Sequence, residues 1–330
     1  MTSRATLLRT MARLERRQYV GRLHPSMWRR GFLSNRWYAY PGIQDPAVPF
    51  ISDAAVEARL RRLNHPAGAR LLEDKNVFAD AVVARGLAAS APEVYGVGLR
   101  GVLHGRSAAA LDRMRAADGV VLKPLDGAGG RGVRIVEGER VASLVAGEPA
   151  AALLVQERLE QHPDLRAVHP GSLNTLRALA IRLPDGDPVV AAAVHRWGTA
   201  ASGAVDNVSS GGLCSAVDLG SGRLGPAVGR PRERGRPSHD RHPDTGAPIT
   251  GETVPHWGEV LDLVGELMTA FPEVTHVGWD VCVTDRGPLV LEGNAGVPNL
   301  NVFQFHGSFL ADPRVRRFYV DHGLLDRRHA

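Results

Sequence analysis

The chain has 330 residues, of which 44% are hydrophobic, with 37 glycines and 22 prolines, enough to bury a substantial core in two or three subdomains. No window holds the roughly eighteen apolar residues of a membrane span, and the N-terminus lacks the apolar core of a secretory signal, so we expect a cytoplasmic protein. Most of the net charge of +5 falls within residues 1–40, so we expect no nucleic-acid partner. The two cysteines, Cys214 and Cys282, are far apart, which excludes a disulfide framework and predicts reduced core residues.

The first 40 residues are strongly basic, and Leu7, Leu8, Met11 and Leu14 give part of a helical apolar stripe. This pattern predicts a basic, largely helical extension over residues 1–70. It could contact an anionic membrane surface or an acidic partner, pack on the body with solvated arginines, or act as an organellar presequence. A single acid, Glu15, is set against nine arginines: Arg4, Arg9, Arg13, Arg16, Arg17, Arg22, Arg29, Arg30 and Arg36.

Cap and stop signals predict the elements that follow. Residues 40–49 are rich in proline and glycine and are typical of a linker. Asp53 predicts the start of a helix to about Leu63, and Asp74 caps a second helix that carries Lys75 on its first turn and stops at Gly86. A strand over 93–97 and a helix over 107–117 come next.

Residues 119–136 predict a hairpin in which an apolar strand carries Lys123, a glycine turn follows, and Val133–Val136 returns as a strand. The turn satisfies G-x-G-x-x-G, but a dinucleotide fingerprint would open a helix. A Walker A loop would continue with Lys and Ser or Thr, and a protein kinase would place its lysine after the glycines. The segment therefore indicates a glycine-rich flap that could fold over phosphates.

The remaining chain predicts more strands than helices. An insertion over 220–251 is expected to be a surface excursion, and Pro255 starts a helix to about Ala270. With helices flanking a strand-rich centre, the pattern predicts an α+β fold. Strands are expected over 151–156, 174–182, 188–197, 212–218, 275–283 and 288–292.

Two groups of residues carry the chemistry. Lys75 and Lys123 are the only lysines among 40 basic residues, which suggests sites that require a compact ammonium, such as phosphate contacts. Asp280 and Glu292 should point to one face from adjacent strands, and Asn294 returns to that face two residues later. Their oxygens suit magnesium or manganese. His239, Asp240 and His242 lack further well-spaced ligands for zinc.

These features together resemble the ATP-grasp superfamily. The resemblance implies that Lys75 and Lys123 bind ATP phosphates and that Asp280, Glu292 and Asn294 hold the metal. It implies a flap from Gly127 to Gly132, with Gly127, Gly129, Gly130 and Gly132 near the phosphates. It also implies an adenine-binding linker at Gln156, Glu157, Leu159 and Glu160, with the acid that approaches the adenine or ribose left open between Glu157 and Glu160.

Further motifs resemble the sugar-transfer-associated ATP-grasp branch, which is related to α-L-glutamate ligases. They are Gln161-His162, Ser172–Arg177, Asp206-Asn207, Gly211-Gly212 and His242–Gly246. Arg177 lies in an apolar strand and is expected to contact the γ-phosphate or an acyl phosphate. For Arg196 a substrate contact and a structural role are both open.

The resemblance implies an ATP-grasp domain over residues 71–330, in which two α+β subdomains clasp ATP. The flap subdomain would span about 107–157 and the metal-binding subdomain about 158–310. The expected activity is a Mg-ATP-dependent carboxylate-amine ligase that works through an acyl phosphate on small-molecule or glycan-linked substrates, in polysaccharide or amino-acid conjugate synthesis. A small-molecule or glycan kinase and a non-catalytic binding protein are the alternatives.

Overall fold

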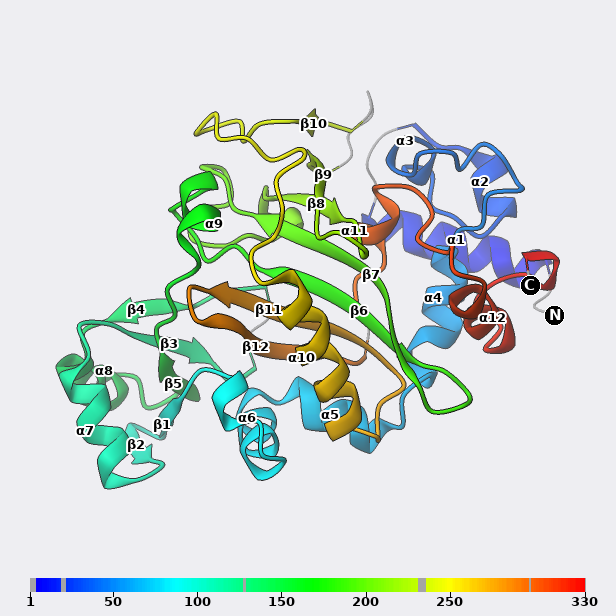
Figure 1. The fold of residues 1–330 in the computed structure, drawn as a ribbon. Helices are drawn as coiled ribbons and strands as arrows, with labels where there is room; N and C mark the ends of the chain where they lie inside the picture. The colour runs from blue at the N-terminus through cyan, green and yellow to red at the C-terminus, as the bar shows by residue number, and fades with distance from the viewer. Residues whose placement is uncertain (1–3, 19–21, 127–128, 231–235, 297, 330) are drawn as a thin grey trace.

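A computed structural model of the chain describes residues 4–18, 22–126, 129–230, 236–296 and 298–329 (Figure 1). It is an α+β structure with two sheets, ordered β2-β1-β5-β3-β4 and β10-β9-β8-β7-β6-β11-β12. All named strand pairs are antiparallel. Among the described helices, none is long and apolar enough to cross a membrane.

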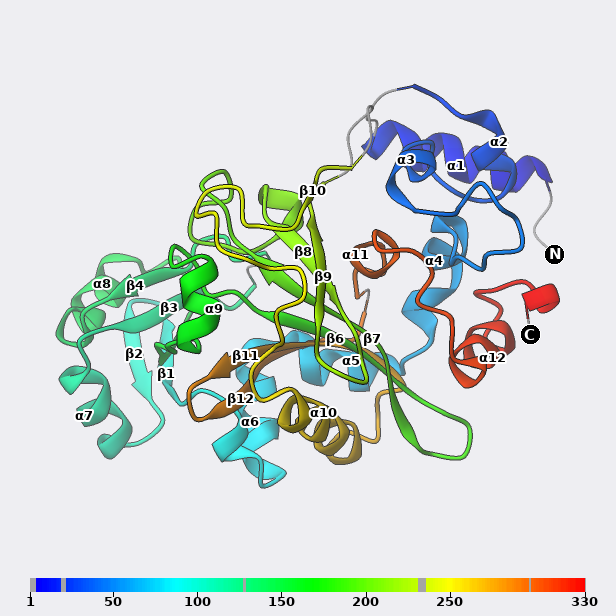
Figure 2. The same cartoon turned by 45° about the horizontal axis from the view of Figure 1, so that its top comes forward.

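The small sheet lies at one end of the molecule (Figures 1 and 2). Helices α7 (Ala108–Ala116) and α8 (Val141–Gly147) pack on it through Met114 and Val145, which are buried with Val120 and Val155. Its edge strand β4 has only three residues, and Ile135 on that strand is exposed. The strands are β1 (Val94–Leu99), β2 (Val102–Gly105), β3 (Val120–Pro124), β4 (Arg134–Val136) and β5 (Leu153–Glu157).

The large sheet separates two hydrophobic cores because its side chains alternate between faces. On β6, Ala178 and Ala180 face one core, and Leu179 and Ile181 face the other. The strands are β6 (Leu176–Arg182), β7 (Pro188–Trp197), β8 (Leu213–Val217), β9 (Leu224–Val228), β10 (Ser238–His239), β11 (His276–Thr284) and β12 (Gly287–Asn294).

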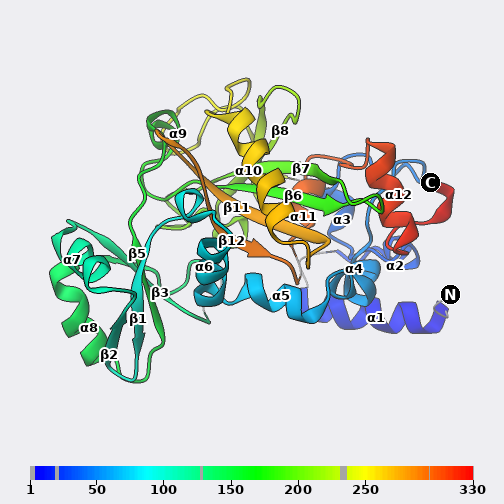
Figure 3. The same cartoon turned by 60° about the horizontal axis from the view of Figure 1, so that its bottom comes forward.

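Helix α10 (Trp257–Ala270) covers the first face through residues such as Val264 and Leu267. Helices α5 (Pro66–Glu73) and α6 (Lys75–Ala84) lie along β12 (Figure 3). Asp74 accepts hydrogen bonds from the amides of Asn76 and Val77 and so caps α6, as predicted. Helix α9 (Pro163–Val168) follows the segment that joins β5 to the large sheet.

N-terminal and C-terminal segments together cover the second face, and Met27, Leu60 and Phe318 share one core. Met11 and Leu14 on α1 pack against Leu33. The helices in this layer are α1 (Arg4–Gln18), α2 (Pro25–Arg29), α3 (Arg36–Ala39), α4 (Asp53–Arg59), α11 (Asn301–Gln304) and α12 (Pro313–Asp321). Short 3-10 turns complete the chain at Leu60–Arg62, Ala88–Ser90, Gly138–Arg140, Val208–Ser210 and Arg327–His329.

Two expectations from the sequence were wrong. Residues 40–49 are not a linker, because Tyr40 and Ile43 are fully buried and the Tyr40 ring stacks on Phe50. The 220–251 insertion is not only a surface excursion, since its apolar stretch forms β9 and pairs with β8 and β10. In both places tertiary packing uses a few apolar side chains within a stretch rich in proline and glycine.

Candidate functional site

The register of three neighbouring strands places charged residues in one row. Asp280 on β11 is directly opposite Arg177 on β6 and Glu292 on β12. Directly paired residues of antiparallel strands project to the same face. Asn294 is paired with Gly278, two positions before Asp280 on β11. The predicted clustering of Asp280 and Glu292 on adjacent strands is therefore confirmed.

Asp280 is held by two arginines. Its carboxylate accepts hydrogen bonds from Nε and Nη2 of Arg177, the latter at 2.8 Å, and from Nη2 of Arg196 at 3.0 Å. Arg177, Arg196 and Asp280 are all buried. Burial alone would raise the pKa of Asp280, but the two guanidinium groups outweigh it and hold the pKa at about 2. Asp280 is therefore ionised at neutral pH.

A second layer of contacts fixes Arg196. Its Nε lies 3.0 Å from Oγ1 of Thr175 and 3.4 Å from Oδ2 of Asp206. Asp206 in turn accepts the Thr175 amide at 2.9 Å. Sequence reasoning gave Thr175 no role, although its position two residues before Arg177, just ahead of β6, was a usable signal. The role of Asp206 depends on a contact between distant segments, which the sequence does not show.

Glu292 differs from Asp280 in its electrostatics. Burial raises the pKa of Glu292, and the adjacent negative charge of Asp280 raises it further, against opposing contributions from Arg177 and Arg196. The amide nitrogen of Asn294 donates to the Gly278 carbonyl at 3.2 Å and lies 3.4 Å from Oε1 of Glu292. The Asn294 amide oxygen can therefore act as an acceptor beside the Glu292 carboxylate.

Both lysines lie near this row. Lys123 projects from β3 of the small sheet and is influenced electrostatically by Glu292 and by Lys75. Burial lowers the pKa of Lys123 to about 8, and the positive charge of Lys75 contributes to the decrease. Lys75, the first residue of α6, donates from Nζ to the Leu125 carbonyl at 3.3 Å. Lys123 on β3 therefore interacts electrostatically with two groups on other elements, Lys75 on α6 and Glu292 on β12.

The glycine flap follows β3. Gly129, Gly130 and Gly132 adopt positive φ angles of 68°, 74° and 76°, which residues with a Cβ adopt only at a cost. A Cβ on Gly130 would also approach Cγ1 of Val205 to 2.4 Å. Gly127, which we also predicted, lies outside the described residues.

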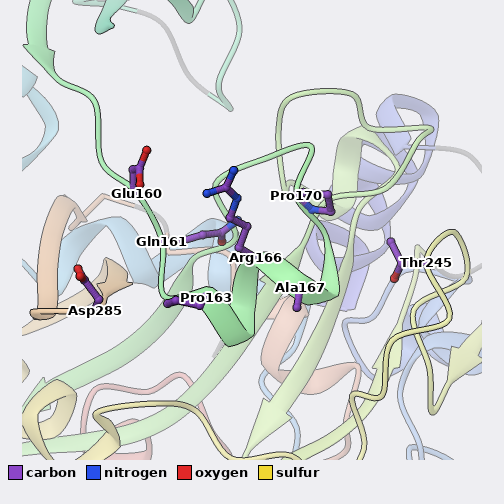
Figure 4. Close-up of a pocket in the computed structure, with 8 residues that line it drawn as sticks. All are labelled: Glu160, Gln161, Pro163, Arg166, Ala167, Pro170, Thr245 and Asp285. Atoms are coloured by element: carbon purple, nitrogen blue, oxygen red, sulfur yellow. The ribbon is translucent and has the colours of Figure 1, made fainter. Parts of the chain in front are cut away.

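The predicted adenine linker joins the two sheets. Gln156 is buried in β5, and the carboxylate of Glu157 accepts the Glu93 amide at 3.0 Å. Leu159 is half-buried. Glu160 is exposed and lines a cavity of about 500 Å³ beside α9 (Figure 4). The structure thus leaves Glu160 more accessible than Glu157.

The donor set fits a magnesium ion. Oxygen atoms of Glu292 and Asn294 are the ligands that hard cations prefer, and a cation beside Glu292 would offset the repulsion from Asp280. A carboxylate has about four acceptor positions, and three guanidinium bonds occupy Asp280, so Glu292 and Asn294 have the greater capacity. The two ammonium groups of Lys75 and Lys123 fit the phosphates of ATP.

Comparisons with solved structures find partial similarity. The ATP-grasp ligase PsnB complexed with minimal precursor is 14% identical, over 74% of this chain and 58% of that one, with a TM-score of 0.40. The L-amino acid ligase from Bacillus licheniformis is 11% identical over 71% and 43%, with a TM-score of 0.41. The D-alanine–D-alanine ligase from Bacillus anthracis is 12% identical over 79% and 70%, with a TM-score of 0.43. The chain spans only 58% of the PsnB structure and 43% of the L-amino acid ligase structure, and no curated protein matches it.

A protein-family model also matches the chain. The family described as "Sugar-transfer associated ATP-grasp" matches residues 141–318, more than half of the chain. The matched residues include Arg177 and Arg196 and the predicted metal ligands Asp280, Glu292 and Asn294. The chain therefore belongs to the sugar-transfer associated ATP-grasp family and has its α+β ATP-grasp fold.

Proposed function

We propose that the protein is a Mg-ATP-dependent carboxylate-amine ligase. The observation that carries this proposal is the electrostatic interaction of Lys123 with both Lys75 and Glu292, three residues on three separate elements. Two ammonium groups, together with the Glu292 carboxylate and the Asn294 side-chain amide, suit a polyphosphate with its counter-cation. A purely structural ion pair would need one lysine and would not require a glycine flap beside it.

Each group has a separate task in this proposal. Lys75 and Lys123 would bind and neutralise the ATP phosphates, and the flap would exclude water from them. Glu292 and Asn294, with the remaining acceptor position of Asp280, would hold the magnesium. The metal, when bound, supplies neutralisation of charge on the phosphates.

Arg177 and Arg196 need a refined role. Arg177 gives Nε and Nη2 to Asp280, and Arg196 gives Nη2 to the same carboxylate. We propose that Nη1 of Arg177 contacts the transferred phosphoryl group, whereas Arg196 positions Asp280. The Arg196 contacts with Thr175 and Asp206 support a positioning role.

The chemistry requires little covalent participation by the protein. A carboxylate oxygen of the substrate attacks the γ-phosphorus of ATP, and ADP leaves. The resulting acyl phosphate is attacked by an amine, which loses a proton and expels phosphate to give an amide. Lys123 and Arg177 would stabilise the charge on the moving phosphoryl group.

The substrate pair is a carboxylate and an amine, and the family's association with sugar transfer favours a glycan-linked or amino-acid conjugate acceptor. We place the reaction in the cytoplasm. Any contact of residues 1–40 with an anionic surface would rely on the arginines, because Met11 and Leu14 are already packed against Leu33.

A screen of carboxylate and amine pairs for ATP consumption tests the proposal. The active pair should release one free phosphate for each amide, and Lys123→Ala and Glu292→Gln should abolish most turnover. Glu266→Gln, an exposed carboxylate on α10, is the matched control and should be active. Phosphate retained on an acceptor hydroxyl would instead identify a kinase, and wild-type turnover by both site variants would refute either enzyme.

A further inference from the structure

Three potential metal ligands meet outside the ATP site. His169 ends α9, while His242 and Asp244 lie in the segment between β10 and α10. One ligand atom from each residue lies within 4.8 Å of the others. The cluster joins segments that are more than 70 residues apart in sequence. It also differs from the run His239, Asp240 and His242, which the sequence alone offers.

His169 has unmet hydrogen-bonding capacity. His169 is only 8% exposed, and among the described residues neither Nδ1 nor Nε2 of its ring has a hydrogen-bond partner. Its backbone is fixed, because the carbonyl accepts Nδ2 of Asn174 at 2.8 Å. A buried polar group without a partner is unfavourable and calls for a ligand. Burial lowers the pKa of His169, which favours the neutral imidazole that binds metals.

His242 is oriented as a metal ligand. Its Nε2 lies 2.7 Å from the Gly198 carbonyl, which can only accept, so Nε2 carries the proton. The lone pair is therefore on Nδ1, which accepts a long hydrogen bond of 3.3 Å from the Asp244 amide. A histidine ligand commonly donates its other ring N–H to a backbone carbonyl in this way.

The rest of the cluster is also oriented. Oδ2 of Asp244 accepts the Ala200 amide at 2.7 Å, which holds the carboxylate beside the two rings. The His169 and His242 rings lie 5.0 Å apart between centroids. Glycine provides the room, since a Cβ on Gly171 would approach Nε2 of His169 to 2.9 Å.

We propose that His169, His242 and Asp244 form a second metal site that binds a divalent transition ion, with Zn²⁺ the preferred one. Two imidazoles and one carboxylate suit Zn²⁺, and three protein ligands leave a fourth position open. This nitrogen-rich set differs from the oxygen donors of Glu292 and Asn294, which suit magnesium.

The site borders the cavity beside α9. Pro170 and Thr245, the chain neighbours of His169 and Asp244, both line this cavity of about 500 Å³ (Figure 4). Arg166 and Glu160 line it as well. An ion here would therefore lie next to a cavity lined by both apolar and charged side chains, where its open position could take an oxygen or nitrogen donor of a small molecule.

Zinc titration of the full-length protein tests the site. The chelator-stripped protein is titrated with Zn²⁺ by calorimetry in excess Mg²⁺, and Co²⁺ is used as a spectroscopic probe of nitrogen ligation. We expect one tight equivalent in the wild type. Asp244→Asn keeps an acceptor for the Ala200 amide. It should weaken Zn²⁺ binding by about tenfold or more, since even the loss of a partner that only orients a metal ligand changes metal affinity by about 10–100-fold.

Two further variants separate this site from its surroundings. His169→Gln should lose the tightly bound equivalent of Zn²⁺, while His239→Gln, near His242 in the sequence, should retain it. Glu292→Gln should also retain it, because the ATP site is separate. Thermal melting of the metal-free variants shows that each is folded. If Asp244→Asn and His169→Gln both bind Zn²⁺ as tightly as the wild type, or if only Glu292→Gln loses it, the proposal is wrong.

Discussion

The two sheets present their charged residues in contrasting surroundings. On the large sheet, Arg177 and Asp280 are buried and engaged with each other, and all nine residues of β11 are buried. On the small sheet, Lys123 is half-buried beside a flap with positive-φ glycines and an exposed edge strand. The comparison suggests that the large sheet is a fixed platform, whereas the small sheet supplies contacts that are completed by the nucleotide.

The largest expected effect is a loss of stability when the buried ion pair of the large sheet is broken. Arg177→Met leaves Asp280 with Arg196 as its main cationic partner, so the loss of stability should be below the roughly 3–5 kcal/mol that a fully uncompensated buried charge costs. Urea denaturation should show a lower midpoint at an unchanged slope. The control is Arg314→Met, which removes the exposed pair with Asp312 and should change stability by less than about 1 kcal/mol. Equal losses of unfolding free energy in the two variants would contradict the description of the Arg177–Asp280 pair as part of a fixed platform.

Glu292→Gln should lower turnover without lowering the stability of the large sheet. We expect kcat to fall about 100- to 1,000-fold, in line with the loss of one group that stabilises transition-state charge. The melting temperature should stay the same or rise, because the raised pKa of Glu292 shows that its charge is unfavourable in the free protein. A clear fall in melting temperature with normal turnover would mean that Glu292 is structural.

Gly130→Ala should affect the flap. An alanine in the left-handed backbone conformation of Gly130 would cost about 1–2 kcal/mol, and the alanine Cβ would contact Val205. We expect weaker ATP binding, measured by calorimetry. Gly186→Ala is the matched control, because Gly186 has a φ of 95° with no atom near the added Cβ and lies in the β6–β7 turn. That variant should lose stability but keep its ATP affinity. Unchanged ATP affinity in Gly130→Ala would show that the flap does not contact ATP.

The smallest effect is a pH dependence. The free protein loses the charge on Lys123 above its pKa of about 8, so ATP binding should take up a proton there and weaken by up to about tenfold per pH unit. Stability of the free protein has the opposite sign and should rise from pH 8 towards the unfolded pKa, because the unfolded state binds more protons. Lys123→Arg, which stays charged, should show a flat affinity profile. A wild-type profile equally flat to pH 10 would contradict this role.

Sequence patterns predicted the local features well. Strand β7 has the predicted bounds, Asp74 caps α6, and the register places Asp280 opposite Glu292. Each of these depends on periodicity or on neighbours within a few residues. Family resemblance added the link between the two lysines and the acidic row, which the fold then brought together.

Contacts between distant segments were not predictable from one sequence. Nothing local shows that Arg196 reaches Asp280, that Asp206 supports both Thr175 and Arg196, or that His169 meets His242. Burial of Tyr40 and Ile43 was missed for the same reason, because their packing partners include the C-terminal layer. Such contacts arise from tertiary packing, which local composition does not specify.

A double-mutant cycle for Mg-ATP binding tests most directly the claim that the two sheets form one phosphate and metal site. Affinity is measured by calorimetry for the wild type, Lys123→Ala, Glu292→Gln and the double variant, with Lys123→Ala and Glu266→Gln as the control pair. We predict a coupling of about 0.5–3 kcal/mol for Lys123 with Glu292 and additive effects for the control pair. Additive effects for Lys123 and Glu292 would contradict a shared site.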